Sequence, residues 1–396
     1  MIATPTLPAI ERPTFGTLDR TVAALAPHLP SSLVSADALE RMLAVTQPLP
    51  AALTRFAYVE CRLAADARQV DVIFDINDEG KVILGGRNPA IELPRRLLEH
   101  PVWQRIREFC RAWADPRSPL QDAVRSIWLE FDLDAPPSDV PVPGIFVRFE
   151  GGSYCQTSLP ESRKYLILRD VVLPLLLGRP PHPAMLARLQ LAFEHLPPSA
   201  QLTEAGLMLQ RSTDSVRLCV RTLPEDQIAG YLTSLRWEGD LAALGATLTT
   251  FSQPAPPGRS RPMAVGYLDL DIGRTTHGTI GLEYFMDTGW QQLARGVPEK
   301  VWLDRLVDAG LCSPEKRDGL LLWPGYSHAH FTHEVWPSIV LRNFNHIKLV
   351  LAPGQPLLAK AYLYFFHRYY KRVTNGSQSQ WKPRSSESST NQRLSL

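Results

Sequence analysis

The chain has 396 residues, of which 44% are hydrophobic and 21% are charged. Such fractions are typical of a globular protein, and this length is enough to bury a large core. A net charge of +2 gives no support to nucleic acid or an anionic membrane as a partner. The longest apolar run, Val171–Leu177, is far too short to span a bilayer.

The cysteines indicate a reducing compartment. The chain has five of them, an odd number with no CxxC pair, and they lie far apart in the sequence. This pattern favours free thiols and a cytoplasmic location over a disulfide framework. Residues 1–15 lack both the basic and the apolar segment of a secretory signal, which agrees with that expectation.

Composition divides the chain into three regions. Residues 1–50 are predicted to form an extended, proline-rich segment followed by a short helix, Ser35–Thr46, in which Ser35 is the candidate N-cap. Residues 51–373 are predicted to form one domain. Residues 374–396 are polar and low in complexity, so we expect a disordered tail.

Paired strands recur through the central region. In Val265–Ile272, Leu268 and Leu270 alternate with Asp269 and Asp271. A period of two places alternate side chains on opposite faces of a sheet, so this strand has one apolar and one polar face. The same pattern predicts five pairs: Phe56–Ala64 with Gln69–Ile76, Ser126–Leu133 with Gly144–Glu150, Ala205–Arg211 with Ser215–Thr222, Val265–Ile272 with Thr279–Met286, and Ile339–Leu351 with Leu357–Phe366.

Helical patterns separate the strand pairs, so the predicted fold class is α+β with about ten antiparallel strands. The strands can form an open sheet covered by helices on its apolar face, or a closed barrel ringed by helices around a polar lumen. Closure removes exposed edges, so we favour the barrel. It requires Leu357–Phe366 to pair with Phe56–Ala64. Residues 77–80 read as a turn, after which Lys81–Leu84 is predicted as a short extra strand.

Five αββα-type units that close into a ten-stranded antiparallel barrel resemble the ABBA prenyltransferases. The likeness covers about residues 50–370 and is one of topology. It implies a transferase that attaches an isoprenyl group from an isoprenyl diphosphate to an aromatic or peptide acceptor in specialised metabolism. The alternative is a non-catalytic barrel that binds a peptide or a small hydrophobic ligand as an accessory to biosynthesis.

Members of that family hold the diphosphate with inward Arg, Lys and Tyr side chains, often as Lys-x-Tyr. Lys360 and Tyr362 match this short pattern, and Tyr364 follows on the same face. Basic side chains in a sheltered lumen can neutralise a diphosphate, and tyrosine rings can shield an allylic cation. The resemblance therefore implies substrate binding by Arg148, Arg217, Arg221, Lys348, Lys360, Tyr362 and Tyr364.

Acidic residues on the polar faces depart from the family pattern. Asp269 and Asp271, and also Glu130 and Asp132, would face the same lumen as the basic residues. Carboxylates repel a diphosphate unless a divalent cation bridges them, so Asp269 and Asp271 are candidate Mg²⁺ ligands. Alternatively, the acids pair with basic residues across the sheet. Glu60 is the candidate base that abstracts a proton from an aromatic acceptor.

A histidine cluster lies near the end of the domain. His328, His330 and His333, followed by Glu334, could bind Zn²⁺ or Fe²⁺, or could belong to a loop packed over a barrel mouth. The chain contains no GxGxxG, Walker, GxSxG or HExxH sequence, which disfavours the common nucleotide-binding and hydrolase classes. A catalytic lumen should gather Lys348, Lys360, Tyr362 and an arginine around one space.

Overall fold

The computed structural model describes residues 16–54, 56–134, 139–149, 159–211, 215–252, 263–286, 297–329, 338–375 and 378–383. Within these ranges, twelve strands form a single antiparallel sheet. The strands are β1 Phe56–Arg62, β2 Val70–Ile76, β3 Val124–Asp132, β4 Gly144–Phe149, β5 Gln201–Leu207, β6 Val216–Arg221, β7 Val265–Ile272, β8 Thr276–Phe285, β9 Gly325–Ala329, β10 Ser338–Leu351, β11 Leu358–Asn375 and β12 Gln378–Pro383.

Ten of these strands close into a barrel, as the sequence predicted. Strands β1 to β8 pair in order, β8 pairs with β10, and β10 pairs with β11. The barrel closes between β11 and β1, in a register that runs from Phe56 opposite Phe366 to Arg62 opposite Lys360. Each of these ten strands therefore has a hydrogen-bonded neighbour on both sides.

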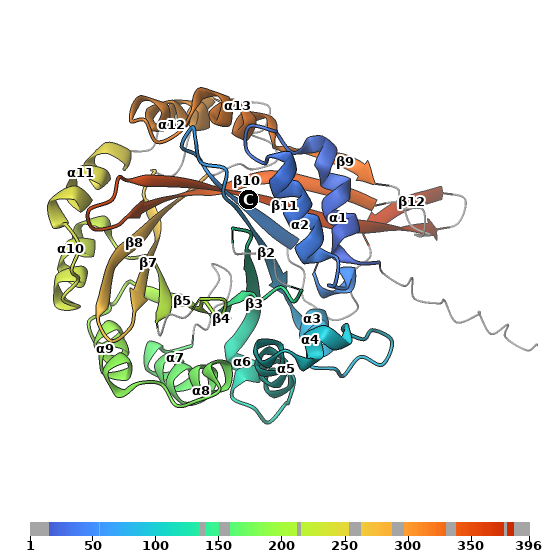
Figure 1. Ribbon diagram of the computed structural model, residues 1–396, viewed down its shortest axis with the longest axis horizontal. Coiled ribbons are helices and arrows are strands. Elements are labelled where there is room, and N and C mark those ends of the chain that lie inside the picture. The colour runs from blue at the N-terminus through green and yellow to red at the C-terminus, as the bar shows by residue number, and fades with distance from the viewer. Residues whose placement is uncertain are drawn as a thin grey trace, which may run out of the picture.

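Helices surround the barrel on the outside (Figure 1). None of the described helices is both long and apolar enough to cross a bilayer. The helices are α1 Leu18–Leu25, α2 Ala36–Thr46, α3 Asp78–Leu84, α4 Arg95–Glu99, α5 Pro101–Trp113, α6 Leu120–Ala123, α7 Glu161–Ile167, α8 Leu173–Leu177, α9 Pro183–Glu194, α10 Glu225–Ser234, α11 Leu241–Phe251, α12 Val297–Asp308 and α13 Pro314–Leu322, with the 3₁₀ turns Ala26–His28 and Ala51–Leu53 and the π-helical turn Leu168–Val172.

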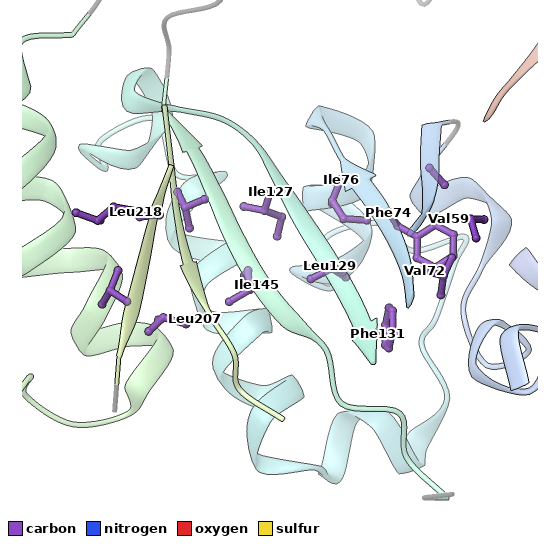
Figure 2. Packing of buried hydrophobic residues seen from close by; sticks show 14 of the residues in the cluster. Val59, Val72, Phe74, Ile76, Ile127, Leu129, Phe131, Ile145, Leu207 and Leu218 are labelled. Atoms are coloured by element: carbon purple, nitrogen blue, oxygen red, sulfur yellow. The ribbon is translucent and has the colours of Figure 1, made fainter. Parts of the chain in front are cut away.

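The main hydrophobic core lies between the strands and the helices. Figure 2 shows part of this layer along β1 to β6, with Val72, Leu129 and Leu218 among its members. These side chains are at most 1% exposed. Because successive side chains alternate between the faces of a strand, the polar set points into the barrel. The prediction that Glu130, Asp132, Asp269 and Asp271 lie opposite the helices is therefore confirmed.

The N-terminal region contains more helix than the sequence indicated. Helix α2 begins as predicted, because Ser35 Oγ accepts a hydrogen bond from the backbone N–H of Ala38 at 3.2 Å. Residues 18–25, however, form helix α1 instead of extended chain, and Leu18, Val22 and Leu25 are buried. Packing of this apolar stripe stabilises a helix that lacks a side-chain cap.

The extra strand predicted at Lys81–Leu84 is wrong, because the segment Asp78–Leu84 is helix α3. Asn77 is its N-cap, and its side-chain oxygen accepts a hydrogen bond from the N–H of Glu79 at 3.0 Å. Asp78 and Glu79 lie in the first turn, where negative charge favours a helix. The polar residues that suggested a turn are thus a helix start.

Part of the predicted disordered tail is a strand. Strand β12 pairs with Tyr370–Asn375 of β11, and β9 pairs with the first residues of β10. These four strands extend the sheet beyond the barrel at one side (Figure 1). The prediction of disorder is therefore corrected for residues 374–375 and 378–383, whereas residues 384–396 lie outside the described part of the chain.

Candidate functional site: a charged lumen beside an aromatic compartment

The lumen has two ends that differ in how the strands connect. At one end the two strands of each pair are joined by a short turn or loop, and at the other end the strands lead to and from helices. Asp269 and Asp271 on β7, Lys348 on β10 and Lys360 on β11 lie toward the turn end. Their clustering follows from barrel closure, since β7 and β11 are not neighbours in sequence.

A small hollow of about 50 Å³, partly open to solvent, lies at this end of the barrel. Gly281 on β8 helps to form it, because a side chain there would collide with Cε of Lys348 and approach Cβ of Asp269 to 3.3 Å. The hollow is lined by Arg217, Asp269, Leu270, Asp271, Thr279, Ile280, Gly281, Lys348, Val350 and Lys360. Three predicted substrate-binding cations and both predicted metal ligands therefore surround one space.

Lys348 is held by two acids. Its Nζ donates a hydrogen bond to Oδ2 of Asp269 and lies 3.6 Å from Oε1 of Glu283. Burial alone would raise the pKa of Asp269, but the charges of Lys348 and Arg217 outweigh it and lower that pKa. Burial and the nearby charge of Asp269 raise the pKa of Glu283 well above its ordinary value. Asp269 is therefore the ionised partner of Lys348.

Arg217 is paired with Asp271 on the neighbouring strand. The guanidinium donates two hydrogen bonds, from Nε to Oδ1 at 2.8 Å and from Nη2 to Oδ2 at 2.9 Å. This bidentate geometry is the strongest form of an arginine–carboxylate contact. Burial would raise the pKa of Asp271, but the hydrogen bonds and charge of Arg217 lower it.

Glu60 lies at the centre of a second charged group. Its Oε1 accepts hydrogen bonds from Lys360 Nζ at 2.8 Å and from Arg62, and its Oε2 accepts one from the hydroxyl of Tyr362. Burial would raise the pKa of Glu60, but Lys360, Arg62 and Lys348 hold it well below its ordinary value. Both oxygens are thus occupied, and the group is an anchor for the Lys-x-Tyr pair.

Two further acids adjoin Glu60. Asp71 lies opposite Glu60 in the β1–β2 register, and Arg62 donates a hydrogen bond to its Oδ2 at 3.1 Å. Burial and the charge of Glu60 raise the pKa of Asp71 to about 8 despite Arg62. The same two causes raise the pKa of Glu130 on β3. This side of the lumen therefore disfavours the ionised form of both carboxyl groups, and Asp71 is mostly protonated at neutral pH.

Aromatic and apolar side chains fill the lumen beyond the charged groups. They form a cluster separate from the main core, so the lumen has an apolar compartment of its own. The residues are Ile73, Trp128, Phe146, Met208, Cys219 and Tyr362, with Phe56, Tyr58 and Tyr267 packed against them. We call this set the aromatic compartment.

His346 joins the aromatic compartment to the charged groups, and it was not among the residues predicted for this site. Its ring stacks on Tyr362 with centroids 4.0 Å apart. Nδ1 lies 2.9 Å from the side-chain nitrogen of Asn345, and Nε2 lies 3.6 Å from Glu283. Burial and the charge of Lys348 lower the pKa of His346 to about 3, so the ring is neutral. Its place two residues before Lys348, on the same polar face of β10, was the available signal.

The remaining predicted residues lie away from the hollow. Arg148 Nε contacts Glu204 at 2.9 Å, and Tyr364 stacks on Phe56 with centroids 5.4 Å apart. Arg221 lies opposite Tyr267 in the β6–β7 register, toward the helix end. The structure therefore brings together Arg217, Lys348, Lys360 and Tyr362, and separates Arg148, Arg221 and Tyr364 from them.

The donors available for Mg²⁺ are few. Asp271 uses both oxygens on Arg217, and Asp269 uses Oδ2 on Lys348, which leaves the buried Oδ1 of Asp269 without a partner. Among the described residues, no group of three His, Cys, Asp or Glu side chains is arranged to hold a metal ion. The ion-pair alternative for these acids is what the structure shows. One free carboxylate oxygen fits only a Mg²⁺ ion held mainly by substrate phosphates.

The histidine cluster is only partly described. His328 lies on β9, opposite Ile339 of β10, and its ring centroid is 6.2 Å from that of Tyr326. Its segment is therefore a strand and not the loop that was expected. His330 and His333 lie outside the described residues, as does Glu334. Metal binding there stays a prediction.

Solved structures with a similar fold include a dimethylallyltryptophan synthase, PriB and AnaPT. 5-Dimethylallyltryptophan synthase from Streptomyces coelicolor is 16% identical, with a TM-score of 0.43 over 88% of this chain and 97% of that chain. The prenyltransferase PriB is 15% identical, with a TM-score of 0.46 over 87% and 94%. AnaPT from Neosartorya fischeri is 10% identical, with a TM-score of 0.46 over 90% and 94%.

No family model and no curated protein matches the chain. At 10–16% identity the structural likenesses concern the fold alone. The fold of this chain is the closed ten-stranded barrel ringed by helices, which is the plan of the ABBA prenyltransferases.

Proposed function

We propose that the chain is a prenyltransferase that transfers an isoprenyl group from an isoprenyl diphosphate to an aromatic or peptide acceptor. One observation carries the proposal. Three cations, Arg217, Lys348 and Lys360, line one hollow at the turn end of the lumen, and the aromatic compartment lies deeper in the same lumen. Three cations can neutralise the diphosphate and stabilise it as a leaving group. The aromatic compartment can take the isoprenyl chain and the acceptor ring, and its π-faces can shield an allylic cation.

The acids define how the diphosphate would bind. Asp269, Asp271 and Glu60 already accept hydrogen bonds from the three cations, so diphosphate oxygens would have to replace or share these contacts. A charge-assisted hydrogen bond is worth roughly 1.5–3 kcal/mol, so the exchange is close to balanced. We propose that Mg²⁺ accompanies the diphosphate with Asp269 as its protein ligand, since a divalent ion would remove the repulsion between carboxylate and phosphate.

Glu60 keeps its proposed role in proton abstraction, but the contacts define when it can act. In the free protein its oxygens are bound to Lys360, Arg62 and Tyr362. A diphosphate that draws Lys360 away would leave Oε1 of Glu60 bound to Arg62 and would raise the pKa of Glu60, because the charge of Lys360 is the main attraction that lowers this pKa. Diphosphate binding would thus precede base activation.

A second candidate function is the non-catalytic barrel that binds a peptide or a small hydrophobic ligand. The observation that favours it is the pairing itself. Arg62, Arg148, Arg217, Lys348 and Lys360 each contact a carboxylate. Such pairing leaves the aromatic compartment as the main binding surface.

Calorimetric titration with dimethylallyl, geranyl and farnesyl diphosphates, with and without Mg²⁺, separates the two candidates. PriB has been solved with L-tryptophan and dimethylallyl thiolodiphosphate, so this pair is a suitable first probe. We expect one diphosphate to bind, and Lys360→Ala to weaken it by roughly ten- to a hundredfold, the value of one charge-assisted contact. Position 360 suits this test because Glu60 keeps Arg62 and Tyr362 as partners when Lys360 is replaced, so no buried carboxylate is left unpaired.

Lys300→Ala is the matched control. Lys300 lies on the outer helix α12, 52% exposed, and pairs only with Asp304 among the described contacts. It should bind diphosphate as the unmodified protein does. Failure of every diphosphate to bind at millimolar concentration would reject the transferase and leave the binding barrel. Equal binding by Lys360→Ala and the control would reject the assigned site.

A further inference from the structure

One buried arginine outside the lumen has no acid paired with it among the described residues. Arg342 lies on β10, between Gly325 of β9 and Phe365 of β11, where the sheet extends beyond the barrel (Figure 1). Phe365, and also Phe344 two residues after Arg342, belong to the core between the strands and the helices. Residues opposite each other, and residues two apart, share one face of a sheet, so Arg342 lies on the helix side of the sheet.

Arg342 is the exception among the buried cations of the described chain. Six lysine and arginine residues there are at most 9% exposed, and five of them contact a carboxylate or backbone carbonyl groups: Arg62, Lys81, Lys164, Lys316 and Lys348. Arg342 is 8% exposed, and its buried Nε has no hydrogen-bond partner. Burial lowers the pKa of Arg342, and no described acid opposes that shift.

The neighbours of Arg342 compensate its charge only in part. Its guanidinium lies over the ring of Trp323, 5.6 Å from the ring centroid. Trp323 is also the C-cap of helix α13, and a helix end of this kind carries roughly half a negative charge. A ring face and a helix end do not amount to a full counter-ion. Because native proteins rarely bury a charge without an ionic partner, the missing partner is an anion.

The surroundings suit an anion with more than one negative charge. Gly325 is half-buried, and a side chain there would come within 3.1 Å of Nη2 of Arg342, so the glycine leaves this edge of the guanidinium uncovered. His28, at the end of the 3₁₀ turn, is also half-buried, and the charge of Arg342 helps to lower its pKa. An anion bound to Arg342 would oppose this effect, and the protonated imidazole would then add a second positive charge.

We propose that Arg342 and His28 form a binding site for a phosphate group on the outside of the barrel. The edge of the guanidinium would donate hydrogen bonds to two phosphate oxygens, while Trp323 supports its face. The site does not depend on the proposed transferase function, since the cations of the hollow lie on the opposite face of the sheet. A bound phosphate would link β10 to the turn that follows helix α1.

Calorimetric titration of the full chain with inorganic phosphate and with acetate tests the site. We expect phosphate to bind at least about tenfold more tightly, because only phosphate carries a second negative charge for His28. Arg342→Met should weaken phosphate binding by at least about tenfold. Its melting temperature without phosphate should stay equal or rise, since the variant removes a buried charge that lacks an ionic partner. Arg95→Met is the control, because the Arg95 side chain is 90% exposed, and it should bind phosphate normally.

Proton NMR of His28 gives a local readout. Phosphate should raise the pKa of the His28 imidazole, and so should Arg342→Met without phosphate, because each removes an uncompensated positive charge near the ring. Gly325→Ala is a second variant that keeps the arginine. It should weaken phosphate binding, because its methyl group would crowd Nη2 of Arg342.

Lys360→Ala separates this site from the hollow, because it should keep the phosphate-dependent shift of His28. Arg342→Met should in turn bind isoprenyl diphosphates as the unmodified protein does. The proposal would be overturned by absence of phosphate binding at millimolar concentration, by equal binding of acetate, or by equal phosphate binding in Arg342→Met and the control. Loss of the His28 shift in Lys360→Ala would likewise reject it and assign the phosphate to the lumen.

Discussion

At the scale of single residues, the lumen is a set of buried ion pairs whose members come from different strands. Such pairs contribute little net stability, because desolvation offsets most of the attraction, but removal of one partner is costly. Lys348 with Asp269 and Lys360 with Glu60 therefore do not explain why the barrel folds. These pairs instead hold charged groups that could exchange their partners for a ligand. The charge of Glu60 also helps to raise the pKa of the nearby Asp71.

Asp71 makes stability depend on pH. Its pKa is about 8 in the folded protein, raised by burial and by Glu60, against about 3.9 in an unfolded chain. The protonated carboxyl therefore stabilises the fold fully below the unfolded pKa, and this contribution is lost as pH rises through the folded pKa. Asp71→Asn keeps the shape and removes the charge. These two pKa values predict that Asp71→Asn gains about 3–4 kcal/mol in stability over the wild type between pH 5 and pH 8.

Urea unfolding of both proteins at pH 5 and pH 8 measures this difference, and the other titrating groups largely cancel in the comparison. If Asp71→Asn is instead destabilised equally at both values, Asp71 is ionised and serves mainly as the partner of Arg62.

At the scale of elements, helix α13 fixes the turn end of the barrel. The ammonium of Lys316 is buried, and it donates hydrogen bonds to the carbonyl oxygens of Arg62 at 2.8 Å, Ala64 at 2.7 Å and Ala67. The N–H of Ser313 adds a bond to the carbonyl of Leu63 at 3.1 Å. The loop between β1 and β2 thus depends on a helix about 250 residues away in the chain.

Lys316→Met should therefore destabilise the protein by about 2–3 kcal/mol, because it leaves buried carbonyl groups without donors while keeping the length of the side chain. Lys300→Met on the exposed face of α12 is the control and should change stability by less than about 0.5 kcal/mol. Denaturant unfolding measures both. Similar small effects from the two variants would show that water can satisfy the carbonyl groups of the loop.

At the scale of the whole molecule, closure depends on the seam between β1 and β11. Val59 and Leu363 face each other across this seam, and both are fully buried against the helices. Because each barrel strand pairs on both sides, loss of packing at the seam weakens the entire ring. The described cysteines, including Cys61 beside the seam, are free and buried, so no disulfide among them secures the closure.

Leu363→Ala should lower the free energy of unfolding by about 2–5 kcal/mol, the usual result of a cavity in a core. The transition should stay single, with tryptophan fluorescence and far-ultraviolet circular dichroism shifting together. Leu322→Ala on α13 is the control, because Leu322 is 78% exposed. Two separate transitions in Leu363→Ala would show that the barrel opens before the rest of the fold is lost.

The sequence alone determined the ten barrel strands and their faces, and it favoured their closure. Alternation such as Leu268, Asp269, Leu270, Asp271 is a property of neighbouring residues, so it can be read without knowledge of the fold. Turns between paired strands then require antiparallel pairing, and the avoidance of free edges favours a barrel. The presence of basic and acidic groups in one lumen follows from the same pattern.

Only the tertiary structure decided which charges meet. Glu60 and Lys360 are 300 residues apart, and their contact depends on the register of β1 against β11. Helices α1 and α3 also required tertiary packing, since one lacks a side-chain cap and the other begins with residues that suit a turn equally well. The physical reason is the same in each case. Local pattern fixes the face on which a side chain lies, whereas its partner, its burial and hence its pKa depend on strands distant in sequence.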